Sequence, residues 1–310
     1  MKTMYGKSLV TVDSLSLSDV DSLFQKADIM QKIVAEKGAT DSLKGKVMAA
    51  LFYEPSSRTF SSFITSMQRL GGAIIPLNGM GATSVAKGET LEDTAKVFSS
   101  YADIIVIRHN QAGSARIFSD NATVPVVNAG DGIGEHPTQA LLDVYTIKSH
   151  FGSFHNLTVG MIGDLLNGRT VHSLSKSLLK VGVRKFIWIS PKALKMPKII
   201  IDRAKTSGAH IRETEDLKKV IGDLDVIYAT RVQKERFTDL AEYERLKLAY
   251  IITPDSMKKA KKTAVLMHPL PRVGEISPQV DSDPRALYLR EQMENGMYIR
   301  MALLDLILNK

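Results

Sequence analysis

Residues 47–59 have the sequence VMAALFYEPSSRT, in which an apolar half is followed by a polar half. Its apolar half, Val47 to Tyr53, has the length and composition of a buried strand. Its polar half ends in Ser56 to Thr59, which bring hydroxyl groups and a guanidinium to the start of the next element. Residues 60–70 then carry apolar side chains at helical spacing, before two glycines end the pattern. The stretch therefore predicts a strand, a polar turn and a helix, in that order.

The polar turn suits an anion. A helix start offers free backbone N–H groups and the positive end of the helix dipole. Arg58 adds a planar fork that can hold two phosphate oxygens at once. The alternative is an ordinary Ser/Thr helix cap with a surface arginine beside it. From this stretch alone, both interpretations are open.

The rest of the chain repeats the alternation of strand and helix. The predicted strands are residues 47–53, 73–77, 103–108, 124–128, 157–162, 186–189, 225–230 and 264–267. The predicted helices are residues 13–37, 60–70, 88–102, 138–150, 171–181, 197–206 and 296–308. Strands separated by helices of this length predict parallel sheets with right-handed crossovers. We therefore expect an α/β fold with two doubly wound parallel-sheet domains and the active site in the cleft between them.

The length of 310 residues also favours two domains over one core. The predicted first domain is residues 1–135 and the predicted second domain is residues 136–289. The last helix, at about residues 290–310, is expected to pack back on the first domain. A glycine-rich loop is expected at residues 78–83.

Composition narrows the class of protein. The chain has no cysteine, which excludes disulfides, thiolate zinc sites and a cysteine nucleophile. It has no apolar run long enough to span a bilayer and no signal-peptide core, so a cytoplasmic protein without membrane contact is expected. The net charge is +8, but the lysines are scattered and no nucleic-acid motif is present. Arginines placed singly within motifs indicate small anionic substrates instead.

Polar side chains follow nearly every predicted strand. They are Ser56 to Thr59, Arg108 and His109, Asn128, His136 and Gln139, Arg169, Arg231 and Gln233, and His268 to Arg272. In open parallel sheets, ligands bind outside the carboxyl ends of the strands. A single residue of this kind often only caps a helix or forms a turn. Arginines at the ends of several strands instead predict a site for more than one anionic group.

Several common chemistries do not fit. Residues 163–170 resemble a phosphate-binding loop, but Arg169 replaces its lysine and no Mg²⁺-holding acid is evident, so an NTPase is not expected. The dinucleotide fingerprint is absent, and the histidines lack metal-ligand spacing. No nucleophile has an evident base. The prediction is an enzyme without metal or cofactor that works by orientation and electrostatic stabilisation.

The ordered motifs resemble the aspartate/ornithine carbamoyltransferase family over nearly the whole chain. They are Ser56-Ser57-Arg58-Thr59, Arg108-His109, His136-Pro137-Thr138-Gln139, Gly163-Asp164 with Gly168-Arg169-Thr170, and His268-Pro269-Leu270-Pro271-Arg272. The aspartate-specific branch is the better match, because residues 268–272 are HPLPR where ornithine enzymes have His-Cys-Leu-Pro. The ornithine-binding Asp-x-x-x-Ser-Met-Gly motif is also missing.

The resemblance implies transfer of a carbamoyl group from carbamoyl phosphate to the α-amine of L-aspartate, an early step of pyrimidine synthesis. The alternatives are another acceptor such as ornithine, and a non-catalytic anion-binding paralogue. An arginine at position 231 argues against ornithine, because it would repel the ammonium group. The second alternative would be favoured by broken anchor residues, and these are intact.

The resemblance also implies roles for single residues. The phosphate would be held by Ser56, Ser57, Arg58, Thr59 and Arg108. The carbonyl oxygen would accept from Thr59, Arg108 and His136, and the carbamoyl amino group would bind Gln139 and the backbone carbonyls of Leu270 and Pro271. L-aspartate would bind Arg169 through its α-carboxylate, and Arg231 and Gln233 through its β-carboxylate. The resemblance further implies a homotrimer in which Ser84 and Lys87 reach a neighbouring subunit's site, and it leaves a separate regulatory chain open.

Overall fold

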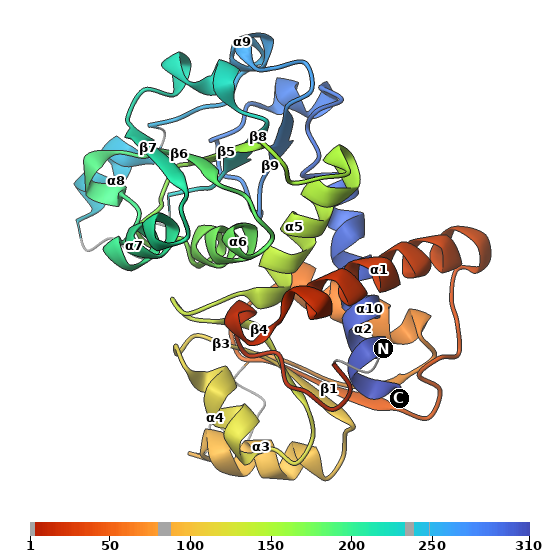
Figure 1. Cartoon of the computed structure of the whole chain (residues 1–310). Helices are drawn as coiled ribbons and strands as arrows, with labels where there is room; N and C mark the ends of the chain where they lie inside the picture. The colour runs from red at the N-terminus through yellow and green to blue at the C-terminus, as the bar shows by residue number, and fades with distance from the viewer. Residues whose placement is uncertain (1–3, 80–87, 233–238, 248) are drawn as a thin grey trace. The chain divides into compact units, whose positions relative to one another are not determined.

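The computed structural model describes residues 4–79, 88–232, 239–247 and 249–310 (Figure 1). Contacts divide the chain into two compact units. Unit 1 comprises Met1–Tyr145 and Glu294–Lys310, and unit 2 comprises Thr146–Met293. The chain enters unit 2 within helix α5 (Pro137–Phe151) and leaves it within helix α10 (Glu291–Leu308).

Unit 1 is built on a four-stranded parallel sheet in the order β2-β1-β3-β4. The strands are β1 (Val47–Phe52), β2 (Ala73–Asn78), β3 (Ile104–His109) and β4 (Val126–Asp131). β3 and β4 are buried along their whole length, which fits the apolar run Ile104 to Ile107 with which β3 begins. Because all four strands are parallel, their carboxyl ends share one edge of the sheet.

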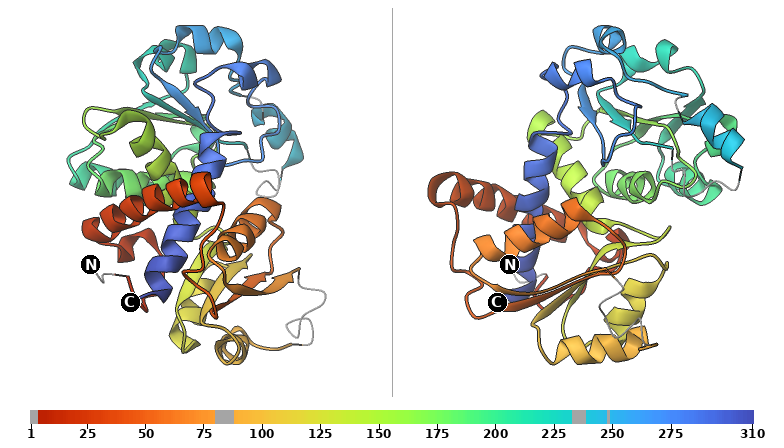
Figure 2. Two further views of the ribbon diagram at one scale, coloured as in Figure 1. Left: turned by 90° about the vertical axis from the view of Figure 1, so that its right-hand side faces the viewer. Right: turned by 180° about the vertical axis from the view of Figure 1, so that it is seen from behind.

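Helices cover both faces of this sheet (Figures 1 and 2). α3 (Leu91–Ser99) and α4 (Ser114–Asn121) pack on one face, where Ala95 and Phe118 join the strand residues of a buried core. α1 (Leu17–Lys37), α2 (Ser57–Arg69) and α10 lie on the other face. The C-terminal helix contacts α2 directly, because Ser66 Oγ donates to the carbonyl oxygen of Met297 at 3.2 Å.

Unit 2 is built on a five-stranded parallel sheet in the order β7-β6-β5-β8-β9. The strands are β5 (Thr158–Ile162), β6 (Lys185–Ile189), β7 (His210–Thr214), β8 (Val226–Ala229) and β9 (Val265–Met267). The helices are α6 (Arg169–Lys180), α7 (Lys198–Thr206), α8 (Leu240–Leu246) and α9 (Pro254–Lys259). In Figure 1, α6 and α7 lie on one face of this sheet and α9 on the other.

The predicted α/β fold with two parallel-sheet domains is confirmed. Each predicted strand is present, and β7 and the short helices α4, α8 and α9 are additional. The chain changes unit after Tyr145, whereas the sequence predicted a boundary after Glu135. Across the described residues, every helix is too short or too polar to cross a membrane.

Candidate active-site residues

The turn after β1 does not cap the next helix, α2, with the side chain of Ser56. Ser56 precedes α2 with φ −160°, and within the described chain its side chain makes no capping hydrogen bond to that helix. Elsewhere the chain caps helices in the usual way, as Ser16 does for Asp19 N and Thr90 for Asp93 N. The hydroxyl of Ser56 is therefore not used to close the start of α2, where Arg58 is exposed.

Arg108 is fixed between two neighbouring strand ends. Its Cα pairs with that of Phe52 across the sheet, so it lies beside the exit of β1. Its Nη1 donates to the carbonyl oxygen of Ala129 in β4 at 3.2 Å, and its Nε lies 3.1 Å from Glu54 Oε2. The side chain is only 11% exposed, so the guanidinium is held in one place at the carboxyl edge of the sheet.

The segments that follow β3 and β4 are in close contact next to Arg108. Gly132 N donates to the carbonyl oxygen of His109 at 2.8 Å, and a Cβ on Gly132 would lie 2.3 Å from Asn110 O. Asp131 accepts from Gly113 N and Glu135 N, which fixes the turn that leads to α5. Burial lowers the pKa of His109, against the raising effect of Glu54, so its imidazole stays neutral at pH 7.

α5 begins with a buried histidine and a buried amide. His136 is 4% exposed, and its carbonyl oxygen accepts from the N–H groups of Gln139 and Ala140 at 3.1 Å. Gln139 Nε2 donates to Asp143 Oδ1 at 3.0 Å, one helical turn away. This bond assigns Nε2 to Asp143, so Oε1 is the atom of Gln139 that can accept from a ligand.

Behind these residues lies the guanidinium of Arg300. It donates to Ser62 Oγ at 2.8 Å and lies 5.1 Å from the centre of the Phe63 ring. Burial lowers the pKa of Arg300 to about 10, Asp143 raises it and Arg108 lowers it further. Asp143 thus compensates a buried charge and orients Gln139 at the same time.

In unit 2, the exits of β5 and β8 approach unusually closely. Gly163 has φ +116°, and a Cβ there would lie 2.2 Å from the carbonyl oxygen of Thr230. Only glycine allows this conformation and this contact. The contact brings the start of the segment that contains Arg169 next to the segment that contains Arg231.

The turn after Gly163 places Arg169 at the first position of α6. Asp164 is fully buried and accepts from Asn167 N at 2.9 Å, while Asn167 Nδ2 also lies within 3.2 Å of its carboxylate. Gly168 precedes the helix without a side-chain cap, and a Cβ there would lie 2.7 Å from Asp164 O. Arg169 therefore stands at a helix start, which favours an anionic ligand.

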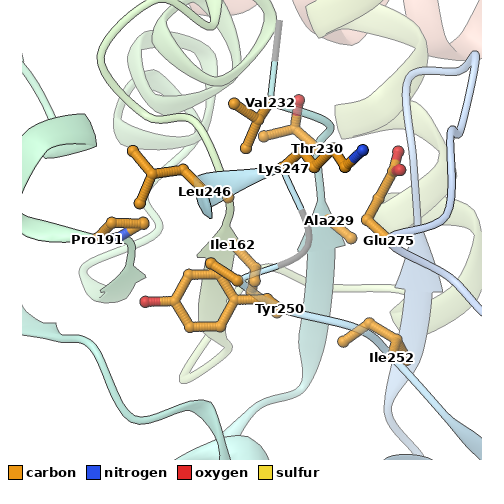
Figure 3. Close-up of a pocket in the computed structure, with 12 residues that line it drawn as sticks. Ile162, Pro191, Ala229, Thr230, Val232, Leu246, Lys247, Tyr250, Ile252 and Glu275 are labelled. Atoms are coloured by element: carbon orange, nitrogen blue, oxygen red, sulfur yellow. The ribbon is translucent and has the colours of Figure 1, made fainter. Parts of the chain in front are cut away.

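A small pocket opens beside these strand ends in unit 2 (Figure 3). Figure 3 shows Thr230, Val232 and Lys247 on one side of it and Tyr250 and Ile252 on the other. Its enclosed part has room for about one water molecule, so the pocket alone cannot hold an amino acid. Burial raises the pKa of Tyr250 to about 12, with smaller effects from Glu215 and Asp216, so its hydroxyl stays protonated.

The segment after β9 contains the last predicted ligands. The Leu270–Pro271 peptide bond is cis, and Leu270 has φ 54°. Arg272 forms an ion pair with Asp281, with Nη2 to Oδ2 at 2.5 Å, and donates to Tyr288 Oη at 3.0 Å. This arginine of the HPLPR motif is therefore a structural anchor in unit 2.

The structure sorts the predicted residues by unit. Unit 1 gathers Ser56, Ser57, Arg58, Thr59, Arg108, His136 and Gln139 at the carboxyl edge of its sheet. Unit 2 gathers Arg169, Arg231, Leu270 and Pro271 at the carboxyl ends of β5, β8 and β9. Ser84, Lys87 and Gln233 lie outside the described residues. Among the described residues, histidine and acidic side chains form no group that could hold a metal ion.

Three acidic residues around the site were not predicted from the sequence: Glu54, Asp143 and Glu275. Glu54 stands directly before the predicted anion turn, and Asp143 lies one helical turn after Gln139. These positions in the sequence were the signals from which contacts of Glu54 and Asp143 with the site residues could have been predicted. Glu275 had no such signal, because its partner His268 is reached only through the fold of the loop.

Two family models match this chain. "Aspartate/ornithine carbamoyltransferase, carbamoyl-P binding domain" matches residues 7–149. "Aspartate/ornithine carbamoyltransferase, Asp/Orn binding domain" matches residues 155–307. Together they account for most of the chain.

Curated relatives and solved structures agree with these matches. The aspartate carbamoyltransferase catalytic subunit of Bifidobacterium adolescentis is 49% identical over 301 residues, which cover 97% of this chain and 93% of the relative. The multifunctional protein pyr1-3 of Dictyostelium discoideum is 47% identical over 305 residues, or 98% of this chain and 14% of that protein.

Among solved structures, aspartate transcarbamoylase from Trypanosoma cruzi in complex with carbamoyl phosphate and aspartate has a TM-score of 0.94 at 41% identity. The match covers 99% of this chain and 98% of that one. The chain therefore belongs to the aspartate/ornithine carbamoyltransferase family, among relatives that are aspartate carbamoyltransferase catalytic subunits.

Proposed function

We propose that this chain transfers the carbamoyl group of carbamoyl phosphate to the α-amine of L-aspartate. The products are N-carbamoyl-L-aspartate and phosphate, as in an early step of pyrimidine biosynthesis. The observation that carries the proposal is that two groups suited to anions lie at adjacent strand ends of unit 1. These are the uncapped helix start at Ser56 and the guanidinium of Arg108, held by Glu54 and Ala129.

In this proposal, the phosphate of the donor binds the start of α2. The backbone N–H groups and hydroxyls of Ser56, Ser57 and Thr59, with Arg58 and Arg108, would neutralise its charge. Thr59, Arg108 and His136 would donate to the carbonyl oxygen. Gln139 Oε1 and the carbonyl oxygens of Leu270 and Pro271 would accept from the amino group.

The reaction is a nucleophilic acyl substitution. The lone pair of the unprotonated aspartate amine attacks the carbonyl carbon, and the carbonyl oxygen gains negative charge in the tetrahedral intermediate. Each donor held in place for this oxygen contributes about 2.7–4 kcal/mol. The carbon–oxygen bond to phosphate then breaks, the phosphate leaves with the bonding electrons, and it takes the proton that the amine loses.

Residues of unit 2 would hold the acceptor. Arg169, at the start of α6, suits the α-carboxylate of aspartate, and Arg231 with Gln233 suits the β-carboxylate. We further propose a homotrimer in which Ser84 and Lys87 complete a neighbouring subunit's site. The absence of cysteine fits a reducing, cytoplasmic compartment.

The test is to incubate the purified chain with carbamoyl phosphate and either L-aspartate or L-ornithine, and to identify products by mass. Carbamoyl aspartate alone is expected. Citrulline instead would keep the carbamoyl-phosphate half of the proposal and overturn the roles of Arg231 and Gln233. No product from folded trimer would indicate a non-catalytic paralogue, and light scattering on the same sample tests the trimer.

A further inference from the structure

The segment from His268 to Glu275 is closed on itself by two buried side chains. The side chain of His268 is 1% exposed and that of Glu275 is 6% exposed. The imidazole Nδ1 of His268 lies 2.8 Å from the backbone nitrogen of Leu270, and Nε2 lies 2.7 Å from Glu275 Oε1. The other carboxylate oxygen, Glu275 Oε2, accepts from Val273 N at 2.7 Å.

These contacts fix where the imidazole proton lies. A backbone N–H can only donate, so Nδ1 must be the acceptor and carry the lone pair. The proton is then on Nε2 and faces Glu275. Burial by itself would raise the pKa of Glu275, but the hydrogen bonds from His268 and from the N–H of Val273 lower it, so the carboxylate is ionised.

The two side chains act on the backbone between them. His268 holds the N–H of Leu270, and Glu275 holds the N–H of Val273, so the four-residue segment from Leu270 to Val273 is held at both ends by this hydrogen-bonded pair of side chains. The backbone of His268 is in turn anchored to α10, because His268 N donates to Gln292 Oε1 at 3.0 Å. The carbonyl oxygens of Leu270 and Pro271 lie inside the segment that these bonds hold.

We propose that His268 and Glu275 are positioning residues that aim the carbonyl oxygens of Leu270 and Pro271 at the amino group of carbamoyl phosphate. The proposal rests on the proposed function, which assigns those two carbonyls to the donor substrate. His268 itself touches no substrate in this account. Its effect is on selection of an amino group over groups that cannot donate a hydrogen bond.

The test compares two stable ligands that differ only at that group. Phosphonoacetamide carries –NH₂ on its carbonyl carbon, and phosphonoacetone carries a methyl group there. Isothermal titration calorimetry on the intact protein gives the ratio of their dissociation constants. The wild-type chain is expected to prefer the amide by about tenfold or more, because the methyl group donates no hydrogen bond to the two carbonyl oxygens.

Two histidine variants separate the two hydrogen bonds of the His268 imidazole. His268→Asn keeps an acceptor at the Nδ1 position for Leu270 N–H, and asparagine before proline favours this turn. His268→Gln keeps a donor at the Nε2 position for Glu275 but loses that acceptor. The amide preference is expected to fall about tenfold in His268→Gln and less than about threefold in His268→Asn, while binding of phosphonoacetone is unchanged in both.

Control variants make the result specific. His172→Gln alters another histidine of unit 2, which contacts Leu165 O at 2.8 Å, and is expected to keep the full preference. Glu275→Gln still accepts from Val273 N and is expected to keep most of it. If His268→Gln does not fold, Glu275→Ala, which releases Val273 N, takes its place and is expected to lose the preference.

The possible results separate the role of the Leu270 and Pro271 carbonyl oxygens from the role of His268 and Glu275. Equal binding of both ligands by the wild-type chain would overturn the role of the Leu270 and Pro271 carbonyls, and this inference with it. A clear wild-type preference that survives in His268→Gln and Glu275→Ala would overturn this inference alone and leave the proposed function standing.

Discussion

Gln139 and Asp143 form a buried hydrogen-bonded pair one turn apart on α5, with Nε2 of the amide 3.0 Å from Oδ1 of the carboxylate. Asp143 is fully buried, and its charge also offsets that of Arg300. One carboxylate therefore acts on Gln139 in α5 and on Arg300 in the C-terminal helix. Removing it should affect stability and substrate binding together.

For Asp143→Asn we expect the free energy of unfolding to fall by about 3 kcal/mol, because the buried Arg300 guanidinium loses its compensating charge. Urea unfolding followed by circular dichroism measures this. Asp120→Asn is the control, because Asp120 pairs with Arg116 at 3.8 Å on the surface, and it should change stability by less than about 0.5 kcal/mol. Equal effects of the two substitutions would contradict the role given to Asp143.

Arg58→Ala should reduce kcat/KM by about 100-fold or more and leave stability within about 0.5 kcal/mol of wild type. Arg58 is exposed at the start of α2, so its loss removes little packing and, under the proposed function, a phosphate contact. Steady-state kinetics and thermal melting are measured on the same preparation. Arg116→Ala, on an exposed face of α4, should change neither quantity. A lowered melting temperature with unchanged activity per folded molecule would refute the assignment of Arg58.

Gly163→Ala should destabilise the chain far more than Gly182→Ala. Both glycines have positive φ, +116° and +96°, so both substitutions strain the backbone, by about 1–3 kcal/mol. Only at Gly163 does the new Cβ also meet Thr230 O at 2.2 Å, while Gly182 has nothing within 4 Å. The extra cost should be at least about 1 kcal/mol in chemical denaturation. Similar losses at both positions would show that the close approach of β5 and β8 is unimportant.

Stability should decrease as the pH falls below about 6.5, in part through His172. Burial lowers the pKa of His172, against the raising effects of the Leu165 hydrogen bond and Asp164. The unfolded chain therefore takes up this proton first, so stability that is present above pH 6.5 is lost on acidification through the folded-state pKa.

His172→Gln removes this titration and keeps a donor for Leu165 O. The slope of unfolding free energy against pH between 6.5 and 5 should become shallower, by at most about 1.4 kcal/mol per pH unit. His109 titrates in the same direction and keeps part of the slope. An unchanged slope in His172→Gln would exclude a contribution from this histidine.

The central strands were predictable because they are buried on both faces and therefore appear as continuous apolar runs. β3 is the clearest case, with every residue of IIVIRH buried. β7, with the sequence HIRET, lies at the edge of its sheet and is mostly exposed, so no apolar run marked it. α4 was missed for a related reason, because its eight residues include only a few buried ones.

That the proposed site residues lie at strand ends was predictable from their position in the chain, and the side chains they contact were not. Arg108 follows an apolar run, which places it at a sheet edge. Its ion pair with Glu54 depends on β1 and β3 being neighbours, and strand order is a tertiary property. His268 and Glu275 meet for the same kind of reason, through a turn that no local pattern of hydrophobicity encodes.

The division of unit 1 between Met1–Tyr145 and Glu294–Lys310 has a consequence for the order in which the chain folds during synthesis. Unit 2 is one continuous segment, so it can complete its core while the ribosome is still adding the final helix. The hydrogen bonds of Ser62 with Arg300 and of Ser66 with Met297 can form only after α10 has been synthesised. The same holds for the ion pair of Lys26 with Asp305, at 2.6 Å. We expect the half of the protein that is translated first to be the half that finishes folding last.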